Sequence, residues 1–197
     1  MNFYLWVILF YLIGSIPFSY ILPKIKGFDV TKSGSSNVGG TNALRTSGSK
    51  VVGFSCMFLD LFKGVIPLYF AKKTFGIDAT ELYILYITVV VGHNYPVWLK
   101  FKGGKGVATT AGGSMGIYPP FFFVFYLTWL PLSLITKYVS LSSLISLFIM
   151  TITGFFIHYK FGITLLILFL FSIYKHRANI KRLINGNENK TYLLGKK

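Results

Sequence analysis

"GVATTAGGSMGIYPPFFFVFYLTWLPLSLIT", residues 106–136, is a run of 31 residues without a charged side chain. The hydrocarbon core of a bilayer is about 30 Å thick, and a helix of about 20 apolar residues crosses it. The run is therefore long enough for more than one crossing. Pro119-Pro120 divides it, because proline breaks a helix. We predict one helix over 107–118 and another over 120–136.

Further uncharged runs lie along the chain, at 1–23, 82–99, 138–159 and 161–174. The 197 residues are 53% hydrophobic, with a mean hydropathy of +0.61, which is too apolar for an ordinary soluble domain of this length. Helices satisfy their own backbone hydrogen bonds in lipid. We therefore predict an all-α integral membrane protein, one membrane-embedded domain over 1–197. The predicted spans are 2–22, 51–71, 82–99, 107–118, 120–136, 138–159 and 161–175.

The first run lacks the basic region and cleavage site of a signal peptide, so we interpret it as a span that stays. Lysine and arginine then set the orientation. With seven spans and the N-terminus outside, 16 of the 20 basic residues fall on the cytoplasmic side. If 107–118 does not cross, the counts become 9 inside and 10 outside. The positive-inside rule therefore favours seven spans and a cytoplasmic C-terminus.

The formal net charge is +15, with five acidic residues. In a membrane protein this balance indicates positive-inside bias and attraction to anionic lipid, or an anionic substrate, rather than nucleic acid. Five scattered carboxylates leave little for a magnesium–nucleotide site. The single Cys56 allows no intrachain disulfide and no cysteine-built metal site. We predict neither a metal nor a cofactor.

Three polar stretches interrupt the apolar pattern, and all three fall on the predicted cytoplasmic side. The first is "KSGSSNVGGTNALRTSG", Lys32–Gly48. Its glycines permit backbone nests that bind anions, and Arg45 offers a planar fork suited to phosphate. A flexible loop of similar composition is the alternative.

The second stretch is "KFKGGKGVATTAGG", Lys100–Gly113, which fits neither the P-loop nor the dinucleotide-binding pattern. Glycine N–H groups, lysine charge and the N-terminus of a helix from Val107 would together favour an anion. A positive-inside anchor explains the lysines but not the glycines. The small residues from Ala108 to Gly113 let another helix pack closely. The candidate anion-binding residues are Lys102, Gly103, Gly104, Lys105 and Gly106.

The third stretch is "YKHRANIKRLINGNENK", Tyr174–Lys190. His176 and Asn179 are three residues apart and share a helix face, from which both could touch a substrate. A basic amphipathic tail on anionic headgroups is the alternative. The serines of "YVSLSS", 138–143, also fall on the cytoplasmic side.

Asp60 and Lys63 stand at i, i+3 inside a predicted span, which indicates first a mutual structural pair. His93 is interpreted as a packed or interfacial histidine. No serine–histidine–acid triad is supported, because the acids are too few. The H-x4-D pattern of soluble-thioester glycerolipid acyltransferases is also absent.

Five stretches taken together resemble one family along nearly the whole chain. The chain resembles the acyl-phosphate:glycerol-3-phosphate acyltransferases of bacterial phospholipid synthesis. The matching stretches are "GSIPFSYIL" (14–22), "GSSNVGGTNALRTSG" (34–48), "LDLFKG" (59–64), "GHNYPVWLKFKGGKGVAT" (92–109) and "YKHRANIKRLINGNENK" (174–190).

The resemblance implies transfer of an acyl group from acyl phosphate to the sn-1 hydroxyl of glycerol 3-phosphate. The products are 1-acylglycerol 3-phosphate (lysophosphatidate) and phosphate, and the donor is neither acyl-CoA nor acyl carrier protein. It also implies seven spans in a bacterial inner membrane, an active site at the cytoplasmic face, no cofactor, and membrane lipids as surroundings. We expect a monomer.

By the same resemblance, the essential residues are Ser35, Arg45, Lys105, His176 and Asn179. Arg45, His176 and Asn179 are expected to hold glycerol 3-phosphate. Lys105 with its glycine loop would hold the donor phosphate, and Ser35 would orient the reacting groups. The proton acceptor is left open between His176, Ser35 and a substrate phosphate oxygen. The expected substrate-binding residues are Ser36, Asn37, Gly39, Thr41, Asn42, Lys102, Gly103, Gly104, Gly106, Ser142 and Ser143.

Glu188 matches a structural acid of the family, and Ser140 is a weaker candidate beside Ser142 and Ser143. The family's first loop commonly reads S-G-N-x-G-A-T-N. Here Ser36 replaces the glycine and Gly40 the alanine. We expect Ser36 to resist a positive φ and Gly40 to loosen the loop.

Two other classes of function fit a basic membrane protein. A transporter of organic phosphates would also need a basic pocket, but such proteins often carry internal repeats, and we find none. A non-catalytic partner of lipid enzymes would leave Arg45, Lys105, His176 and Asn179 without a role.

Overall fold

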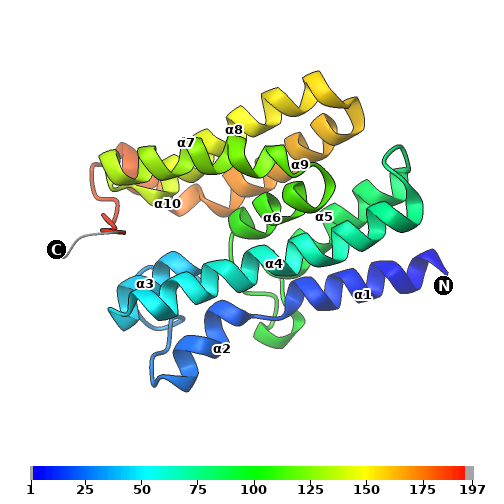
Figure 1. Cartoon of the computed structure of the whole chain (residues 1–197). Helices are drawn as coiled ribbons and strands as arrows, with labels where there is room; N and C mark the ends of the chain where they lie inside the picture. Colours follow the sequence, from blue (N-terminus) through cyan, green and yellow to red (C-terminus); the bar gives the residue numbers. More distant parts are fainter. Residues whose placement is uncertain (1, 194–197) are drawn as a thin grey trace. The chain divides into compact units, whose positions relative to one another are not determined.

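The computed structural model describes residues 2–193, and the regular structure within them is entirely helical (Figure 1). The chain divides into two compact units, Met1–Pro119 and Pro120–Lys197. The first holds α1 (Phe3–Ser15), α2 (Phe18–Ile25), α3 (Gly40–Ser47), α4 (Lys50–Phe75), α5 (Thr80–Asn94), the short 3₁₀ helix η1 (Val97–Leu99) and α6 (Val107–Ile117). The second holds α7 (Pro120–Thr136), α8 (Val139–Ile157), α9 (Tyr159–Lys175) and α10 (Arg177–Ile184).

The predicted first span, 2–22, is broken in the structure. α1 ends at Ser15, and α2 begins at Phe18 after Ile16-Pro17. A residue that precedes proline is disfavoured in the helical conformation, and Ile16 is extended. The break turns the backbone carbonyl of Ile16 away from helical pairing and makes it available to a side chain.

Four of the described segments are long and apolar enough to cross a membrane: Phe3–Ile25, Lys50–Phe75, Thr80–Leu99 and Val139–Ile157. α9 and α10 together make a fifth, bent by 62°. α6, with 11 residues, and α7, with 17, are shorter. Apart from the break in the first, the long helices therefore lie over the predicted spans, while the count of seven crossings stays a prediction.

Glycines lie where helices of the first unit pack together. A Cβ atom at Gly14 of α1 would overlap the carbonyl oxygen of Val89 on α5. A Cβ at Gly112 of α6 would likewise overlap the carbonyl oxygen of Leu61 on α4. Small residues let membrane helices approach this closely. The predicted close packing behind the small residues of α6 is thus confirmed.

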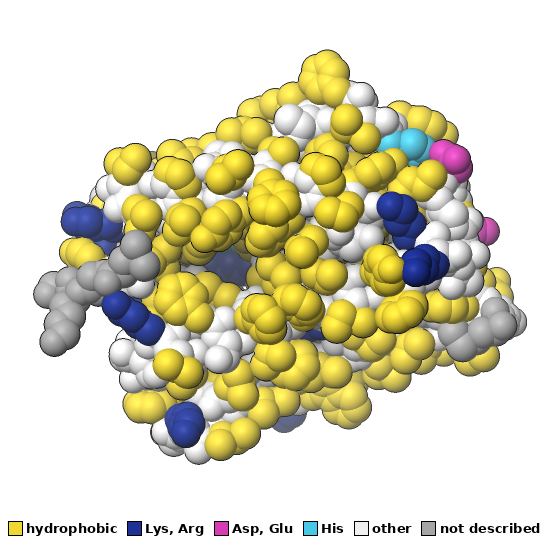
Figure 2. All heavy atoms as spheres, viewed as in Figure 1, with side chains coloured by type: hydrophobic (Ala, Val, Ile, Leu, Met, Phe, Trp, Pro, Cys, Tyr) yellow, Lys and Arg dark blue, Asp and Glu magenta, His cyan; other side chains and the backbone are white. Residues whose placement is uncertain are grey.

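The outer side chains of the long helices are mostly hydrophobic, as the yellow surface in Figure 2 shows. Phe156 on α8 is 83% exposed, and Phe58 on α4 and Leu127 on α7 are also exposed. Apolar exposure of this extent is costly in water and is the expected surface of helices in lipid.

In the second unit, α8 packs against both α7 and α9, and α10 follows the bend at His176. The chain then turns back. The backbone N–H of Thr191 donates to the carbonyl oxygen of Lys137, 2.8 Å away, so the segment 185–193 lies against the start of α8.

Candidate active site

Asn42 organises the first polar stretch. Its side-chain oxygen accepts from the backbone N–H of Ser35 at 2.8 Å, and its amide donates to the carbonyl oxygens of Val30, Ser33 and Asn37. The side chain is buried. Asn42 therefore holds the loop that presents Ser35, and a direct contact between Asn42 and a substrate stays a prediction.

Arg45 lies in the last turn of α3, a helix that the sequence analysis did not predict. Gly48 ends α3 with a left-handed φ of 62°, which is a common way for a helix to end. The helix and the Asn42 hydrogen bonds give this stretch a defined structure, so the flexible-loop alternative is not what the structure shows. Arg45 and Ser35 are both half-buried.

Two expectations about departures from the family's loop need correction. Ser36 does adopt a positive φ, 54°, at the position where glycine is common. Gly40 does not loosen the loop, because it is the first residue of α3 and is buried against α4. A Cβ atom there would overlap Met57 Cγ and lie 3.0 Å from the carbonyl oxygen of Gly53.

The N–H groups of Gly103 and Gly104 are not directed as predicted. They donate to the carbonyl oxygens of Asn94 and His93, at 3.2 and 3.1 Å, so the loop is attached to the end of α5. A Cβ on either glycine would overlap α5 or the residues just after it. Gly103 and Gly104 therefore allow the loop to lie close to the end of α5. Anion binding by these two residues stays a prediction.

Lys105 and Gly106 lead directly into α6. Gly106 has a left-handed φ of 79° and is followed by the first helical residue, Val107. The N–H groups of a first turn have no acceptor inside the helix, and the helix dipole favours an anion there. Lys105 is half-buried beside this helix start, whereas Lys102 is exposed.

The two loops of the first unit meet. A Cβ atom on Gly104 would lie 2.5 Å from the carbonyl oxygen of Val38, which stands between Ser35 and Arg45 in sequence. The structure therefore brings together the first and second polar stretches. The remaining predicted residues of the first loop, Asn37, Gly39 and Thr41, are half-buried in the same region.

His176 is buried at the bend between α9 and α10. Its Nδ1 lies 2.8 Å from the carbonyl oxygen of Ser172. A carbonyl oxygen can only accept, so this contact requires the hydrogen on Nδ1. In the neutral ring the lone pair then lies on Nε2. Ser172 Oγ lies 3.2 Å from the same nitrogen, so two contacts with Ser172 hold the ring, and the shorter one favours the tautomer with the hydrogen on Nδ1.

Asn179 is buried on α10 and donates to Glu188 Oε1 at 2.6 Å. Ser140 Oγ donates to the same oxygen at 2.9 Å, and Arg182 Nε to Oε2 at 2.8 Å. These hydrogen bonds support the predicted structural role of Glu188, because its carboxylate connects the tail to both α8 and α10. Ser142 and Ser143 are buried on α8 and donate to backbone carbonyls one turn earlier.

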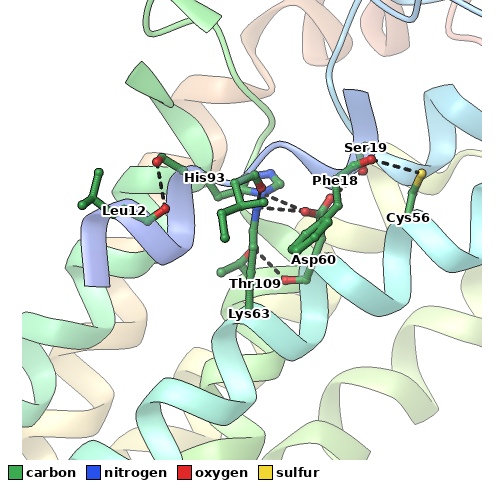
Figure 3. A network of polar contacts seen from close by, with 10 residues as sticks. Leu12, Phe18, Ser19, Cys56, Asp60, Lys63, His93 and Thr109 are labelled. Atoms are coloured by element: carbon green, nitrogen blue, oxygen red, sulfur yellow. Dashed lines mark hydrogen bonds and ion pairs between the residues drawn. The ribbon is translucent and has the colours of Figure 1, made fainter. Parts of the chain in front are cut away.

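A buried charged cluster lies in the first unit, and the sequence analysis identified only part of it (Figure 3). Lys63 Nζ lies 2.9 Å from Asp60 Oδ1, which confirms the predicted pair. His93 is buried, as its packed interpretation predicts, and its Nδ1 lies 3.6 Å from the same oxygen. Ser19 Oγ donates to Asp60 Oδ2 at 2.5 Å. In the sequence, this cluster was indicated by two charged residues, Asp60 and Lys63, in an otherwise apolar run.

Known proteins match this chain along nearly its full length. The family model for glycerol-3-phosphate acyltransferase matches residues 4–186. A glycerol-3-phosphate acyltransferase of Thermotoga petrophila is 48% identical over 195 residues, 98% of each chain. One of Aquifex aeolicus is 42% identical over 190 residues, 93% of this chain and 96% of its own.

Solved structures agree. The glycerol 3-phosphate form of PlsY (YgiH), an integral membrane glycerol 3-phosphate acyltransferase, is 39% identical with a TM-score of 0.91, covering 95% of this chain and 94% of its own. Its lysophosphatidic acid form is 38% identical with a TM-score of 0.88, covering 98% and 96%. The helical fold, the apolar surface and these matches together show that this chain belongs to the glycerol-3-phosphate acyltransferase family of integral membrane proteins.

Proposed function

We propose that this protein moves a fatty acyl group from acyl phosphate to the sn-1 hydroxyl of glycerol 3-phosphate, in an early step of phospholipid synthesis. The products are lysophosphatidate and phosphate. The observation that carries the proposal is the meeting of the two polar loops of the first unit, which carry Arg45 and Lys105. A related structure was solved in a glycerol 3-phosphate form, which supports the acceptor.

Electrostatics favours this pair of substrates. Both carry phosphate, and the chain has 20 basic residues against five acidic ones. The planar guanidinium of Arg45 can hold a phosphate through two parallel hydrogen bonds. We assign the binding of glycerol 3-phosphate to Arg45, His176 and Asn179.

The donor is assigned to Lys105 and the start of α6. In the transfer, the sn-1 oxygen bonds to the acyl carbon, and the bond between that carbon and the phosphate oxygen breaks. The phosphate leaves with the electron pair of that bond. A positive side chain and a helix N-terminus both stabilise the negative charge that develops on it. Acyl phosphate is already activated, so the reaction needs no covalent enzyme intermediate and no metal.

The hydroxyl proton needs an acceptor. His176, Ser35 and a substrate phosphate oxygen remain the three candidates. The contact between His176 Nδ1 and the carbonyl oxygen of Ser172 supports the first, since a hydrogen on Nδ1 leaves the lone pair of the neutral ring on Nε2. Replacing His176 with glutamine preserves a polar side chain but removes the base. If His176 is the acceptor, kcat falls in this variant.

The proposed topology has seven spans, with the N-terminus outside and both polar loops at the cytoplasmic face of the inner membrane. In it, α6 and α7 cross with the help of their flanking loops. Single cysteines at residues 49 and 137, in a Cys56→Ala background, should react with a membrane-impermeant thiol reagent only from the cytoplasmic side. A cysteine at residue 160 should react only from outside.

The reaction itself is tested with purified protein in lipid. Palmitoyl phosphate and glycerol 3-phosphate are supplied, and lysophosphatidate and phosphate are measured. Arg45→Ala and Lys105→Ala should each lower kcat/KM by about 100-fold or more. Lys100→Ala, which removes an exposed lysine close to the same glycine loop, is the matched control and should stay within about twofold. Uptake of glycerol 3-phosphate into proteoliposomes without any acylated product would instead identify a transporter.

A further inference from the structure

The strongest unassigned feature is the buried cluster around Asp60. Asp60 is 2% exposed, Lys63 6% and His93 8%. Charges inside a membrane span are costly and rare unless they serve a function. Replacing a buried ion pair with apolar side chains is often neutral for stability, so stability alone does not account for this one. With a neutral imidazole, the cluster has no net charge.

The cluster is connected to the segments that carry the donor loop. Lys63 Nζ donates to the carbonyl oxygen of Ile16 at 2.9 Å, at the break between α1 and α2. The carbonyl oxygen of Asp60 accepts from Thr109 Oγ1 at 2.9 Å, in the first turn of α6. The loop that carries Lys105 leads directly into that turn. The cluster therefore fixes both the break and the helix that follows the loop.

His93 makes the most direct connection. Its carbonyl oxygen accepts from the N–H of Gly104, and its ring lies so close to that residue that a Cβ on Gly104 would overlap Nε2. The other ring nitrogen, Nδ1, faces Asp60. The imidazole thus lies between the carboxylate of Asp60, which it faces in Figure 3, and Gly104.

A small cavity lies at the same place. It measures about 10 Å³, close to the minimum for one water molecule, and is lined by Ser19, Asp60, Lys63, His93, Val38 and Gly104, among others. Both polar loops of the first unit contribute to its wall, Val38 from the first and Gly104 from the second. The cluster is therefore directly beneath the point where those loops meet.

We propose that Ser19, Asp60, Lys63 and His93 form a positioning cluster that fixes the Gly103–Gly106 loop, and with it Lys105, for binding the phosphate of the acyl donor. The inference rests on the proposed function for its choice of substrate. None of the four residues is assigned to contact a substrate. Each acts through the loop, so the predicted signature is a selective loss of donor binding.

The test uses two variants in the purified full-length protein. His93→Ala removes the ring beneath Gly104, and Asp60→Asn/Lys63→Met removes both charges together. The apparent KM for palmitoyl phosphate should rise by about tenfold or more, since small misplacements of binding groups have large effects. The KM for glycerol 3-phosphate should stay within about twofold. His93→Gln, which refills the space with a polar side chain, should recover part of the loss.

Tyr86→Phe is the matched control. Tyr86 is buried on the same helix as His93, and its hydroxyl donates to the carbonyl oxygen of Thr110 on α6. Loss of this hydrogen bond should lower stability without raising the KM for palmitoyl phosphate more than the KM for glycerol 3-phosphate. The inference is wrong if Tyr86→Phe also raises the KM for palmitoyl phosphate selectively. It is also wrong if the cluster variants raise both KM values equally.

Hydrogen–deuterium exchange without substrates tests the same inference independently of activity. Amides of 100–106 should exchange faster in the cluster variants than in the wild type, while those of α3 should not change. Unchanged exchange in the loop overturns the inference. If the double variant does not fold, His93→Ala and Ser19→Ala decide the outcome. Absence of acyl transfer in the wild type would contradict the proposed function, and the exchange result would still decide whether the cluster fixes the loop.

Discussion

Two buried carboxylates, one in each unit, are held by similar numbers of partners in different surroundings. Asp60 lies on α4 within a membrane-spanning helix and faces Ser19, Lys63 and His93. Glu188 lies in the tail, outside the spans, and accepts from Ser140, Asn179 and Arg182. The side chain of Lys63 is 3% exposed, but that of Arg182 is 33% exposed.

The difference shows how surroundings set the cost of a broken pair. The side chain of Lys63 is almost closed off from solvent, so its charge is poorly hydrated when its carboxylate is lost. Arg182 already touches water and can be rehydrated. The same change of an acid to alanine should therefore be far more damaging at Asp60 than at Glu188.

The largest effect is expected for Asp60→Ala. The variant leaves the Lys63 ammonium buried without its partner, which costs about 3–5 kcal/mol. We expect poor accumulation in the membrane and a much lower thermal unfolding temperature in detergent. Asp60→Asn/Lys63→Met, which removes both charges, should restore most of the stability. An Asp60→Ala protein as stable as the wild type would contradict this account of the cluster.

Glu188→Ala should have a smaller and more local effect. It leaves Asn179 and Ser140 without their acceptor, at about 1–3 kcal/mol, whereas Arg182 gains water. Proteolysis should become faster within 185–193, and activity should fall because Asn179 is no longer held. Glu188→Gln, which preserves an acceptor oxygen, is the control. Proteolysis of Glu188→Ala at the wild-type rate would show that the carboxylate does not hold the tail.

The same carboxylate predicts a pH dependence. Burial alone would raise the pKa of Glu188, but hydrogen bonds from Asn179, Ser140 and Arg182, with the charge of Arg182, lower it below its ordinary value of 4.5. A lowered pKa means that its contribution to stability is present above the ordinary value and lost as the pH falls through the folded-state value. The difference in unfolding temperature between wild type and Glu188→Gln should therefore be constant above pH 5 and shrink below pH 4.5. A difference that grows in acid would reverse the assigned direction.

The smallest effect is expected at Ser36, where the backbone φ is 54°. A residue with a Cβ pays about 1 kcal/mol or more in the left-handed region relative to glycine. Ser36→Gly should therefore raise the free energy of unfolding by about 1 kcal/mol. Ser36→Ala, which retains the Cβ, should give no such gain. Equal stability of the glycine and alanine variants would show that the strain is absent.

The positions of the helices were largely predictable, because charged residues and prolines mark where many of them begin and end. α7 covers the predicted 120–136 residue for residue, between the proline pair and Lys137. α3 was missed because it has only eight residues and begins among glycines. The break at Ile16-Pro17 was not predicted, because the uncharged run 1–23 indicates one continuous span, although proline disfavours a helical conformation in the residue before it.

The residue types of the site were predictable from the sequence, but the contacts between those residues were not. The i, i+3 spacing identified Asp60 with Lys63, since those residues share a helix. Ser19 and His93 come from other helices, and no spacing in the sequence relates them to Asp60. Similarly, the glycines of the second loop were predicted for anion binding, whereas the N–H groups of Gly103 and Gly104 donate to carbonyl oxygens at the end of α5. Which carbonyl groups Gly103 and Gly104 contact depends on the packing of α5, which local sequence does not show.

A comparison of two acyl donors decides whether the protein uses acyl phosphate. Purified protein in lipid receives glycerol 3-phosphate with either palmitoyl phosphate or palmitoyl-CoA, and lysophosphatidate is quantified. We expect lysophosphatidate with palmitoyl phosphate, formed together with an equal amount of phosphate, and none with palmitoyl-CoA. Product formed only with palmitoyl-CoA, in protein shown to be folded, would contradict this expectation.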